Sequence, residues 1–246
     1  MDKAYRFRFY PTPEQEQLLR RTMGCVRLIY NRALAARTEA WYSLQERIDY
    51  IKVIIEYAVQ FDPVFDEIAY QGVPDIRVII YRGVPAMAML RLPTRASDGK
   101  ANLHKGGVGV GIDLSTGTTL AGIQNNRYID NHPETGHPLR ERQIPYWQTI
   151  LEMATKLGDK TEFGYLGVDI VLDREKGPLL LEINARPGLS IQIANREGLI
   201  PRLEAIDSAL SKLSGVQEKI AFAQETFAVG TPLRSKVKFL NAKAKT

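Results

Sequence analysis

The chain has very little cysteine, and it lacks long apolar runs. Its single cysteine, Cys25, excludes an internal disulfide framework and a zinc site built from several cysteines. No apolar run approaches the roughly 20 residues that span a bilayer. The opening residues, MDKAYRFRFYPT, contain no apolar stretch of the kind that secretory signals carry. These absences predict a cytoplasmic protein that does not contact a membrane.

The composition is otherwise ordinary and mildly basic. Hydrophobic residues make up 44% and charged residues 25% of the 246 positions, as expected for a globular protein of one or two domains. The formal net charge of +5 permits a polyanionic partner such as a nucleotide or a nucleic acid, but it does not require one. A mildly basic soluble protein is an equally good interpretation of the charge alone, and the oligomeric state is not predicted.

The first fifty residues differ in pattern from the rest of the chain. AYRFRFY alternates aromatic and basic side chains, which predicts a strand with one apolar face. Thr12 is then placed to cap an arginine-rich amphipathic helix, with Pro13 at its first position. We therefore predict three parts, each with its own pattern: a strand–helix segment in residues 1–50, the main domain in residues 51–228, and a basic tail in residues 229–246.

From residue 53 onward the pattern changes to short apolar strands, turns and helices. VIIEYAV predicts a strand, and hairpins are predicted with turns at Arg82-Gly83 and Ser115–Gly117. GYLGVDIVLD and GPLLLEIN predict two more strands that pair with each other. Apolar residues recur at helical spacing in three stretches: residues 145–156, 195–213 and 216–227. The predicted fold class is α+β, with a mostly antiparallel sheet packed by helices.

Polar side chains end the second strand of the last pair. Glu182 and Asn184 are two residues apart, so they share one face of the strand, and Asp169 lies on the neighbouring strand. Three hard oxygen ligands on adjacent strands suit Mg²⁺. Arg186 continues the same spacing and could neutralise phosphate charge. On spacing alone, a solvated strand end followed by an ordinary turn is the more common interpretation.

Further polar residues lie upstream and could face the same ligand. Asp75 and Arg77 share a strand face, and Arg91 and Arg95 flank a strand end. A polar loop then offers three more candidates, Asn102, Gly106 and Gly107. Convergent arginines and a glycine-rich loop suit a polyphosphate or an acyl phosphate, although each arginine alone is more often a surface cation.

Two other features of the sequence do not indicate a ligand site. GGVGVGID lacks the Gly-Lys-Ser/Thr ending of a phosphate loop and the glycine spacing of a dinucleotide fingerprint, so a tight hairpin is predicted there. His104 is one of three histidines and is not spaced for zinc with the others.

Residues 53–227 resemble the ATP-grasp enzymes. The resemblance rests on two long segments with several motifs in the right order, VIIEYAVQFDPVFDEIAYQGVPDIRVIIYRGVPAMAMLRLPTRASDGKANLHKGGVGVGID and GYLGVDIVLDREKGPLLLEINARPGLSIQIANREGL. It is nearest to the α-L-glutamate-ligase-like proteins, which are related to the RimK-type ligases. In that family ATP phosphorylates a carboxylate, and an amine then attacks the acyl phosphate to form an amide.

The resemblance implies ATP and Mg²⁺ as cofactors, and a carboxylate substrate with an amine acceptor as partners. The implied metal ligands are Asp169, Glu182 and Asn184. The arginines implied or expected to hold phosphate or the substrate carboxylate are Arg77, Arg91 and Arg186. The residues implied to contact the nucleotide are Glu56, Tyr57, Ala58, Asn102, Gly106 and Gly107. Which carboxylate and which amine are used is not predicted.

One departure from the family bears on activity. Nothing before Val53 resembles the N-terminal part of the ATP-grasp enzymes, whose lysines and glycine-rich loop clamp ATP from the opposite side. We therefore expect a nucleotide cleft that lacks half of its walls, with impaired turnover.

Residues 2–42 carry a second resemblance. KAYRFRFYPTPEQEQLLRRTMGCVRLIYNRALAARTEAWY resembles the N-terminal segment of TnpB/OrfB-type transposase-associated proteins. There the segment belongs to a nucleic-acid-binding region, which implies DNA or RNA contacts through Arg6, Arg8, Arg20, Arg21 and Arg27. The family's nuclease part and its cysteine zinc site are missing, so no cleavage chemistry is expected. A solvated basic helix is an equally good interpretation of these arginines.

Overall fold

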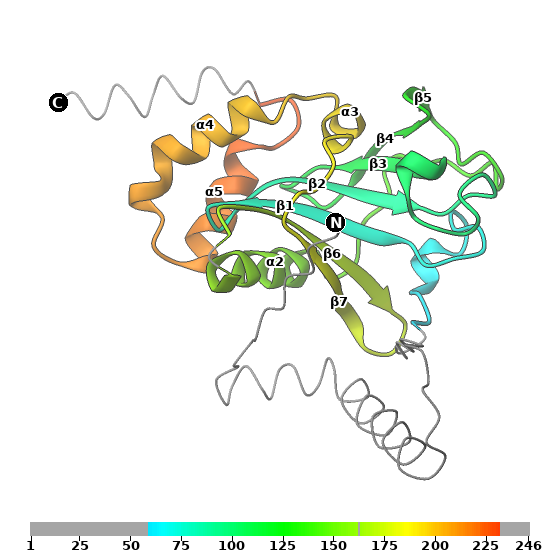
Figure 1. Ribbon diagram of the computed structural model, residues 1–246, viewed down its shortest axis with the longest axis horizontal. Coiled ribbons are helices and arrows are strands. Elements are labelled where there is room, and N and C mark those ends of the chain that lie inside the picture. The colour runs from blue at the N-terminus through cyan, green and yellow to red at the C-terminus, as the bar shows by residue number, and fades with distance from the viewer. Residues whose placement is uncertain (1–58, 162, 232–246) are drawn as a thin grey trace, which may run out of the picture. The chain divides into compact units, whose positions relative to one another are not determined.

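A computed structural model describes residues 59–161 and 163–231 of the chain. The strand predicted at VIIEYAV, the strand–helix segment in residues 1–50 and all but the first residues of the basic tail lie outside this part. Within it, a single antiparallel sheet is packed by helices (Figure 1). This confirms the predicted α+β class.

The sheet has seven strands in the order β5-β4-β3-β2-β1-β6-β7, and every neighbouring pair is antiparallel. Both predicted hairpins and the predicted pairing of the last two strands are confirmed. The short β5 was not predicted; it follows a tight turn at Asn125 and Asn126, whose φ angles of 48° and 60° suit asparagine. The strand bounds are β1 Asp75–Tyr81, β2 Val84–Leu92, β3 Val108–Ile112, β4 Thr119–Gln124, β5 Arg127–Ile129, β6 Tyr165–Asp173 and β7 Gly177–Asn184.

Helices pack against the sheet: α2 lies between β5 and β6 in the chain, and the others follow β7. Their bounds are α2 Trp147–Thr161, α3 Ile191–Asn195, α4 Ile200–Ala209 and α5 Val216–Thr226, with short 3-10 turns at Pro63–Phe65, Leu103–Lys105 and Leu210–Lys212. The helix predicted at 195–213 is shorter than expected. Arg196, with a left-handed φ of 55°, ends α3, and Pro201 then opens α4. None of the helices in the described ranges is long and apolar enough to cross a membrane.

The two faces of the sheet differ in character. On one face Ile76, Val78 and Ile80 of β1 are fully buried, and α2 packs there so closely that a Cβ at Gly158 would lie 2.5 Å from Ile80. The other face carries Asp75 and Arg77, since successive side chains of a strand alternate. Apolar side chains and α2 therefore cover one face. The other, which we call the polar face, carries these charged groups beside the buried Met89, and α3 packs on it at Gly111.

Candidate functional site

Five charged side chains meet on the polar face of the sheet, and we call them the charged cluster: Asp75, Arg77, Arg91, Asp169 and Glu182. The strand register pairs Asp75 with Arg91, Arg77 with Asp169, and Asp169 with Glu182. Directly opposed residues of antiparallel strands point to the same face, so the cluster crosses four adjacent strands, β2, β1, β6 and β7. Residues more than 100 positions apart are thereby brought together.

Asp169 lies at the centre of the cluster and is fully buried, with 0% of its surface exposed. Arg77 donates two hydrogen bonds to it, from Nε to Oδ1 at 2.7 Å and from Nη2 to Oδ2 at 2.5 Å. Arg91 Nη2 donates to Oδ2 as well, at 2.7 Å. Burial alone would raise the pKa of Asp169, but these two guanidinium groups outweigh it and hold the pKa below its ordinary value. Asp169 is thus a paired, ionised carboxylate.

Arg91 also contacts a second carboxylate. Its Nε donates to Oδ1 of Asp75 at 2.5 Å, so one guanidinium bridges Asp75 and Asp169. Asp75 is 5% exposed, and burial raises its pKa to about 7 although Arg91 partly offsets this. The D-x-R spacing had placed Asp75 on the same face as Arg77, but no role was assigned to it from the sequence.

Glu182 is the solvent-exposed member of the charged cluster. Its side chain is 58% exposed, and Oε1 lies 3.8 Å from Arg77 Nη2. A hydrogen bond shared with Asp169 raises the pKa of Glu182, with burial and the charge of Asp169 acting in the same direction. Two carboxyl groups therefore face each other at the edge of the sheet, which is an arrangement that a cation would stabilise.

Asn184 and Arg186 lie where β7 ends. Asn184 Oδ1 accepts a hydrogen bond from the Arg186 backbone N–H at 2.9 Å, which forms a turn directly after the strand. Pro187 then approaches β6 so closely that a Cβ at Gly167 would lie 2.8 Å from it. Arg186 is exposed on this turn. The predicted metal ligand Asn184 is therefore on the same face as Glu182, with its side chain also serving the turn.

The residues present fit a magnesium ion that keeps other ligands. Asp169, Glu182 and Asn184 offer carboxylate and amide oxygens from two neighbouring strands, the donor type that Mg²⁺ prefers. Among the described residues no three His, Cys, Asp or Glu side chains form a metal-binding group, so a closed protein cage is not available here. Because arginines already hold both oxygens of Asp169, a metal ion must share or displace those contacts.

The loop residues Asn102, Gly106 and Gly107 lie close to this edge. A Cβ at Gly188 would lie 3.6 Å from His104 Nε2, which places the loop beside the turn after β7. Asn102 caps the loop's 3-10 turn by accepting from the His104 N–H at 3.0 Å, and the backbone N–H of Gly107 donates to the Asn102 carbonyl. Gly106 has a left-handed φ of 94° that favours glycine. The contacts of Asn102 in this structure are therefore within the loop, and they fix its backbone conformation.

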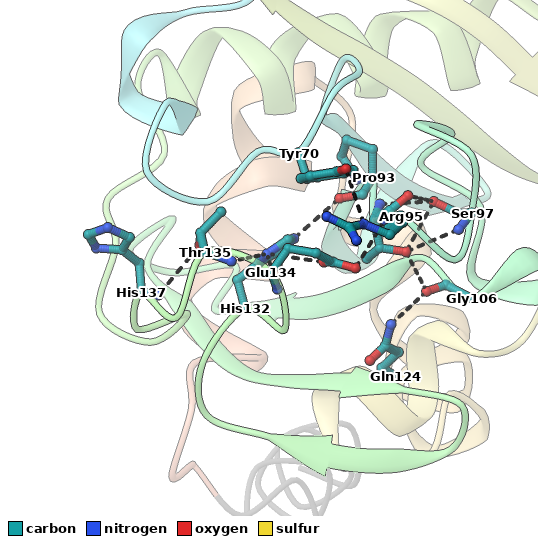
Figure 2. A network of polar contacts seen from close by, with 11 residues as sticks. Tyr70, Pro93, Arg95, Ser97, Gly106, Gln124, His132, Glu134, Thr135 and His137 are labelled. Atoms are coloured by element: carbon teal, nitrogen blue, oxygen red, sulfur yellow. Dashed lines mark hydrogen bonds and ion pairs between the residues drawn. The ribbon is translucent and has the colours of Figure 1, made fainter.

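A second polar network holds the same loop at Gly106 (Figure 2). We call it the loop cluster: Pro93, Thr94, Arg95, Ser97, Gly106, Gln124, His132, Glu134 and Thr135. Thr94 Oγ1 and Gln124 Nε2 both donate to the Gly106 carbonyl at 2.9 Å, and the buried His132 places Nε2 3.2 Å from the Pro93 carbonyl. Burial lowers the pKa of His132. Sequence reasoning missed this network, whose contacts join segments far apart in the chain.

Several predicted residues lie elsewhere. Arg95 packs over the Tyr70 ring at 5.5 Å and belongs to the loop cluster. A pocket of about 340 Å³ is lined by β4, α3 and residues 228–231, and it includes no member of the charged cluster. Outside the described residues lie the expected hinge and the expected nucleic-acid contacts: Glu56, Tyr57, Ala58, Arg6, Arg8, Arg20, Arg21 and Arg27.

Comparison with known proteins gives two findings. A family model described as sugar-transfer associated ATP-grasp matches residues 16–208. The match begins upstream of the boundary predicted at residue 51. A "Putative RNA-guided DNA endonuclease" from Streptomyces pristinaespiralis is 56% identical over 50 residues, which are 20% of this chain and 12% of that protein. The chain thus matches only a small part of that relative's length.

Proposed function

The chain belongs to the sugar-transfer associated ATP-grasp family, and from this premise we propose that the charged cluster binds Mg²⁺ and ATP for a ligase-type reaction. The observation that carries the proposal is the convergence of Arg77 and Arg91 on Asp169, next to Glu182 and Asn184. Cations and hard oxygen ligands on one face of a sheet suit a metal-bound polyphosphate. The matched family does not single out the RimK-related branch, so a glutamate-type substrate is part of the proposal.

In this proposal each group of residues has a distinct task. Asp169, Glu182 and Asn184 would hold the ion, which supplies charge neutralisation on the phosphate oxygens when bound. Arg77 and Arg91 neutralise the transferred phosphoryl group, and Arg186 on the exposed turn adds a third cation. The loop from Asn102 through Gly106 and Gly107 lies beside the ligand.

The reaction class follows from the family resemblance. The γ-phosphoryl group of ATP passes to a carboxylate oxygen, which gives an acyl phosphate and ADP. An amine then attacks the acyl carbon, phosphate leaves, and the amine gives up a proton as the amide forms. Phosphoryl transfer depends mainly on positioning and charge neutralisation, which is what paired arginines beside a metal provide.

Thermal unfolding of the full chain with and without Mg²⁺ and ATP tests the binding step. A ligand at about 100 times its Kd stabilises the folded protein by about 2.7 kcal/mol, which corresponds to a rise of roughly 5–10 °C in Tm for a chain of this size. We expect the rise to require Mg²⁺ and to vanish in Glu182→Ala. Glu204→Ala, at an exposed carboxylate on α4, is the matched control and should keep the full rise.

A second assay separates binding from turnover. Release of ADP in the presence of candidate carboxylates reports the phosphoryl transfer itself. A Mg²⁺-dependent rise in Tm without ADP release would support the expected impairment of the cleft. No rise for the wild-type chain would reject the charged cluster as a nucleotide site.

A second candidate function is nucleic-acid binding through residues 1–50, favoured by the 56% identity to the named endonuclease over 50 residues. Binding of the full chain to a labelled oligonucleotide should weaken steeply as salt rises, because phosphate contacts release counterions. Arg20→Ala with Arg21→Ala should reduce the slope of that dependence by about 2. An unchanged slope would remove this candidate.

A further inference from the structure

Asp75 stands apart from the residues to which the proposed function gives a task. It is buried on β1, and it contacts Arg91 through Oδ1. It has no place in the expected metal or phosphate sets. Yet the Arg91 guanidinium that it holds is the same group that reaches Asp169 with Nη2. The question is what the contact between Asp75 and Arg91 adds to the site.

The strand register shows why Arg91 needs a partner. On one side of β2, Arg91 is opposite Asp75 of β1. On the other side it is opposite Gly109 of β3, which has no side chain, and Leu103 of the loop fills the space there, 2.7 Å from where a Cβ of Gly109 would lie. Asp75 is therefore the side chain on the flanking strands that can fix this long and flexible arginine by a charge-assisted hydrogen bond.

The two contacts of Arg91 use different parts of its guanidinium group. Nε faces Asp75 and Nη2 faces Asp169, so the plane of the group is defined by two points. A guanidinium held at two points is oriented, whereas one held at a single point can rotate. With Asp75 in place, Arg91 stands beside Arg77 on the same carboxylate.

Net stability is a poor explanation for this pair. Burying a carboxylate and a guanidinium costs desolvation that their attraction often only offsets, and apolar replacements of similar size are commonly neutral. The pair is better explained by its effect on geometry: Asp75 holds Arg91 Nε, and this contact orients the guanidinium group toward the site.

We propose that Asp75 is a positioning residue, which holds the Nε side of Arg91 so that its Nη2 side faces Asp169 and the phosphoryl group. The proposal rests on the proposed function for the identity of the ligand. It adds to that function the residue that orients one of the two arginines.

A double-mutant cycle on Mg²⁺·ATP affinity tests the proposal, with variants Asp75→Asn, Arg91→Met and both together. At a pH above 7, where Asp75 is ionised, we expect Asp75→Asn to weaken binding about tenfold, the scale of one lost charge-assisted hydrogen bond. The double variant should bind no more weakly than Arg91→Met alone, because Asp75 acts through Arg91. Effects that add in the double variant would overturn the proposal. Asp130→Asn, which breaks the exposed pair with Arg140, is the control and should leave affinity unchanged.

A second measurement tests, without any ligand, whether Asp75 holds Arg91 Nε. In protein labelled with ¹⁵N at arginine Nε, the Arg91 Nε–H should exchange slowly with water in the wild type and at least tenfold faster in Asp75→Asn, while Arg77 keeps its rate. An unchanged Arg91 rate would overturn the proposal. If Asp75→Asn does not fold, Asp75→Glu replaces it, since one extra methylene also displaces the oxygens from Arg91 and the same results are expected.

The double-mutant cycle and the exchange measurement together distinguish failure of the proposed function from failure of the role proposed for Asp75. If the wild-type chain does not bind Mg²⁺·ATP, the proposed function fails, and the exchange rate of Arg91 Nε–H still shows whether Asp75 orients that arginine. If the chain binds but the cycle is additive, the proposed function stands and the role of Asp75 is wrong.

Discussion

The charged cluster and the loop cluster begin two residues apart at the end of β2, yet their polar contacts are mostly of different kinds. Arg91, near the end of β2, joins the charged cluster through side-chain contacts with Asp75 and Asp169. Pro93, just beyond β2, joins the loop cluster through its backbone carbonyl, which faces His132. In the first network side chains bind side chains, whereas in the second most contacts join a side chain to the backbone.

This difference affects how easily a ligand can replace a contact in each network. A contact between two side chains can be exchanged for a ligand by rotating a side chain. A contact between a buried side chain and a backbone carbonyl, such as that of Thr94 with Gly106, costs more to break, because both polar groups are then left buried without a partner. We therefore expect changes in the charged cluster to alter ligand binding as well as stability, and changes in the loop cluster to alter mainly stability.

The largest effect is expected for Asp169→Asn. Removing this charge leaves Arg77 and Arg91 buried with one carboxylate fewer, and breaking a buried pair costs about 3–5 kcal/mol. Mg²⁺-dependent nucleotide binding should also be lost. Urea unfolding measures the first effect and calorimetric titration the second. Asp207→Asn, at an exposed carboxylate paired with Arg82, should change stability by at most about 1 kcal/mol. Equal unfolding midpoints for the wild type and Asp169→Asn would contradict the central role of Asp169.

The pH dependence of stability should reveal Asp75. Folding raises its pKa from 3.8 to about 7, because burial outweighs the attraction of Arg91 and Arg77, and Asp169 adds to the rise. Between these two pH values the folded protein holds a proton on Asp75 that the unfolded chain has lost. The stability from this proton is therefore full below about pH 4 and is lost as pH rises to 7, by up to about 4 kcal/mol.

Comparison with Asp75→Asn isolates this contribution from the other carboxylates. The difference in unfolding free energy between the wild type and the variant should shift against the wild type as pH rises from 4 to 7. A difference that stays constant across the range would show that Asp75 does not titrate there.

The next effect belongs to the loop cluster. His132→Ala removes a buried ring and its contact with the Pro93 carbonyl, which should cost about 2–3 kcal/mol of stability. If the two networks divide the work as argued, Mg²⁺·ATP affinity measured well below Tm should stay within about threefold of the wild type, a difference of less than 1 kcal/mol. His137→Ala, at a half-exposed histidine on the same loop, is the control and should leave both quantities nearly unchanged. A large loss of affinity in His132→Ala would show that the loop cluster also contributes to ligand binding, and would contradict the separation of the two networks.

The sequence predicted well what local spacing encodes. Turn residues at Arg82-Gly83 and Ser115–Gly117 indicated the hairpins, and two-residue spacing correctly placed Asp75 with Arg77 and Glu182 with Asn184 on shared faces. These features depend on residues close together in the chain, where alternation and turn chemistry act directly.

Contacts between distant strands were beyond such reasoning. The pairing of β1 with β6 brings Arg77 to Asp169 across 92 positions, and no local pattern specifies it. Arg91 and Arg95 look equivalent in the sequence. Because β2 ends at Leu92, Arg91 stays on the sheet face, whereas Arg95 turns toward Tyr70. His132 was missed for the same reason, since its partner at Pro93 is 39 positions away.

The smallest and most discriminating effect is expected for Arg77→Lys in the binding of Mg²⁺ alone. Lysine keeps the positive charge but cannot reproduce the two-point grip on Asp169, so an oxygen of Asp169 becomes available to the ion. We expect Mg²⁺ affinity to rise about threefold to tenfold, a gain of about 0.7–1.4 kcal/mol. Titration calorimetry without nucleotide measures it, and Arg82→Lys, at an exposed arginine paired with Asp207, is the control. A lower affinity in Arg77→Lys would mean that Arg77 holds Asp169 in place for the ion, so the contacts of the charged cluster are as fixed as those of the loop cluster.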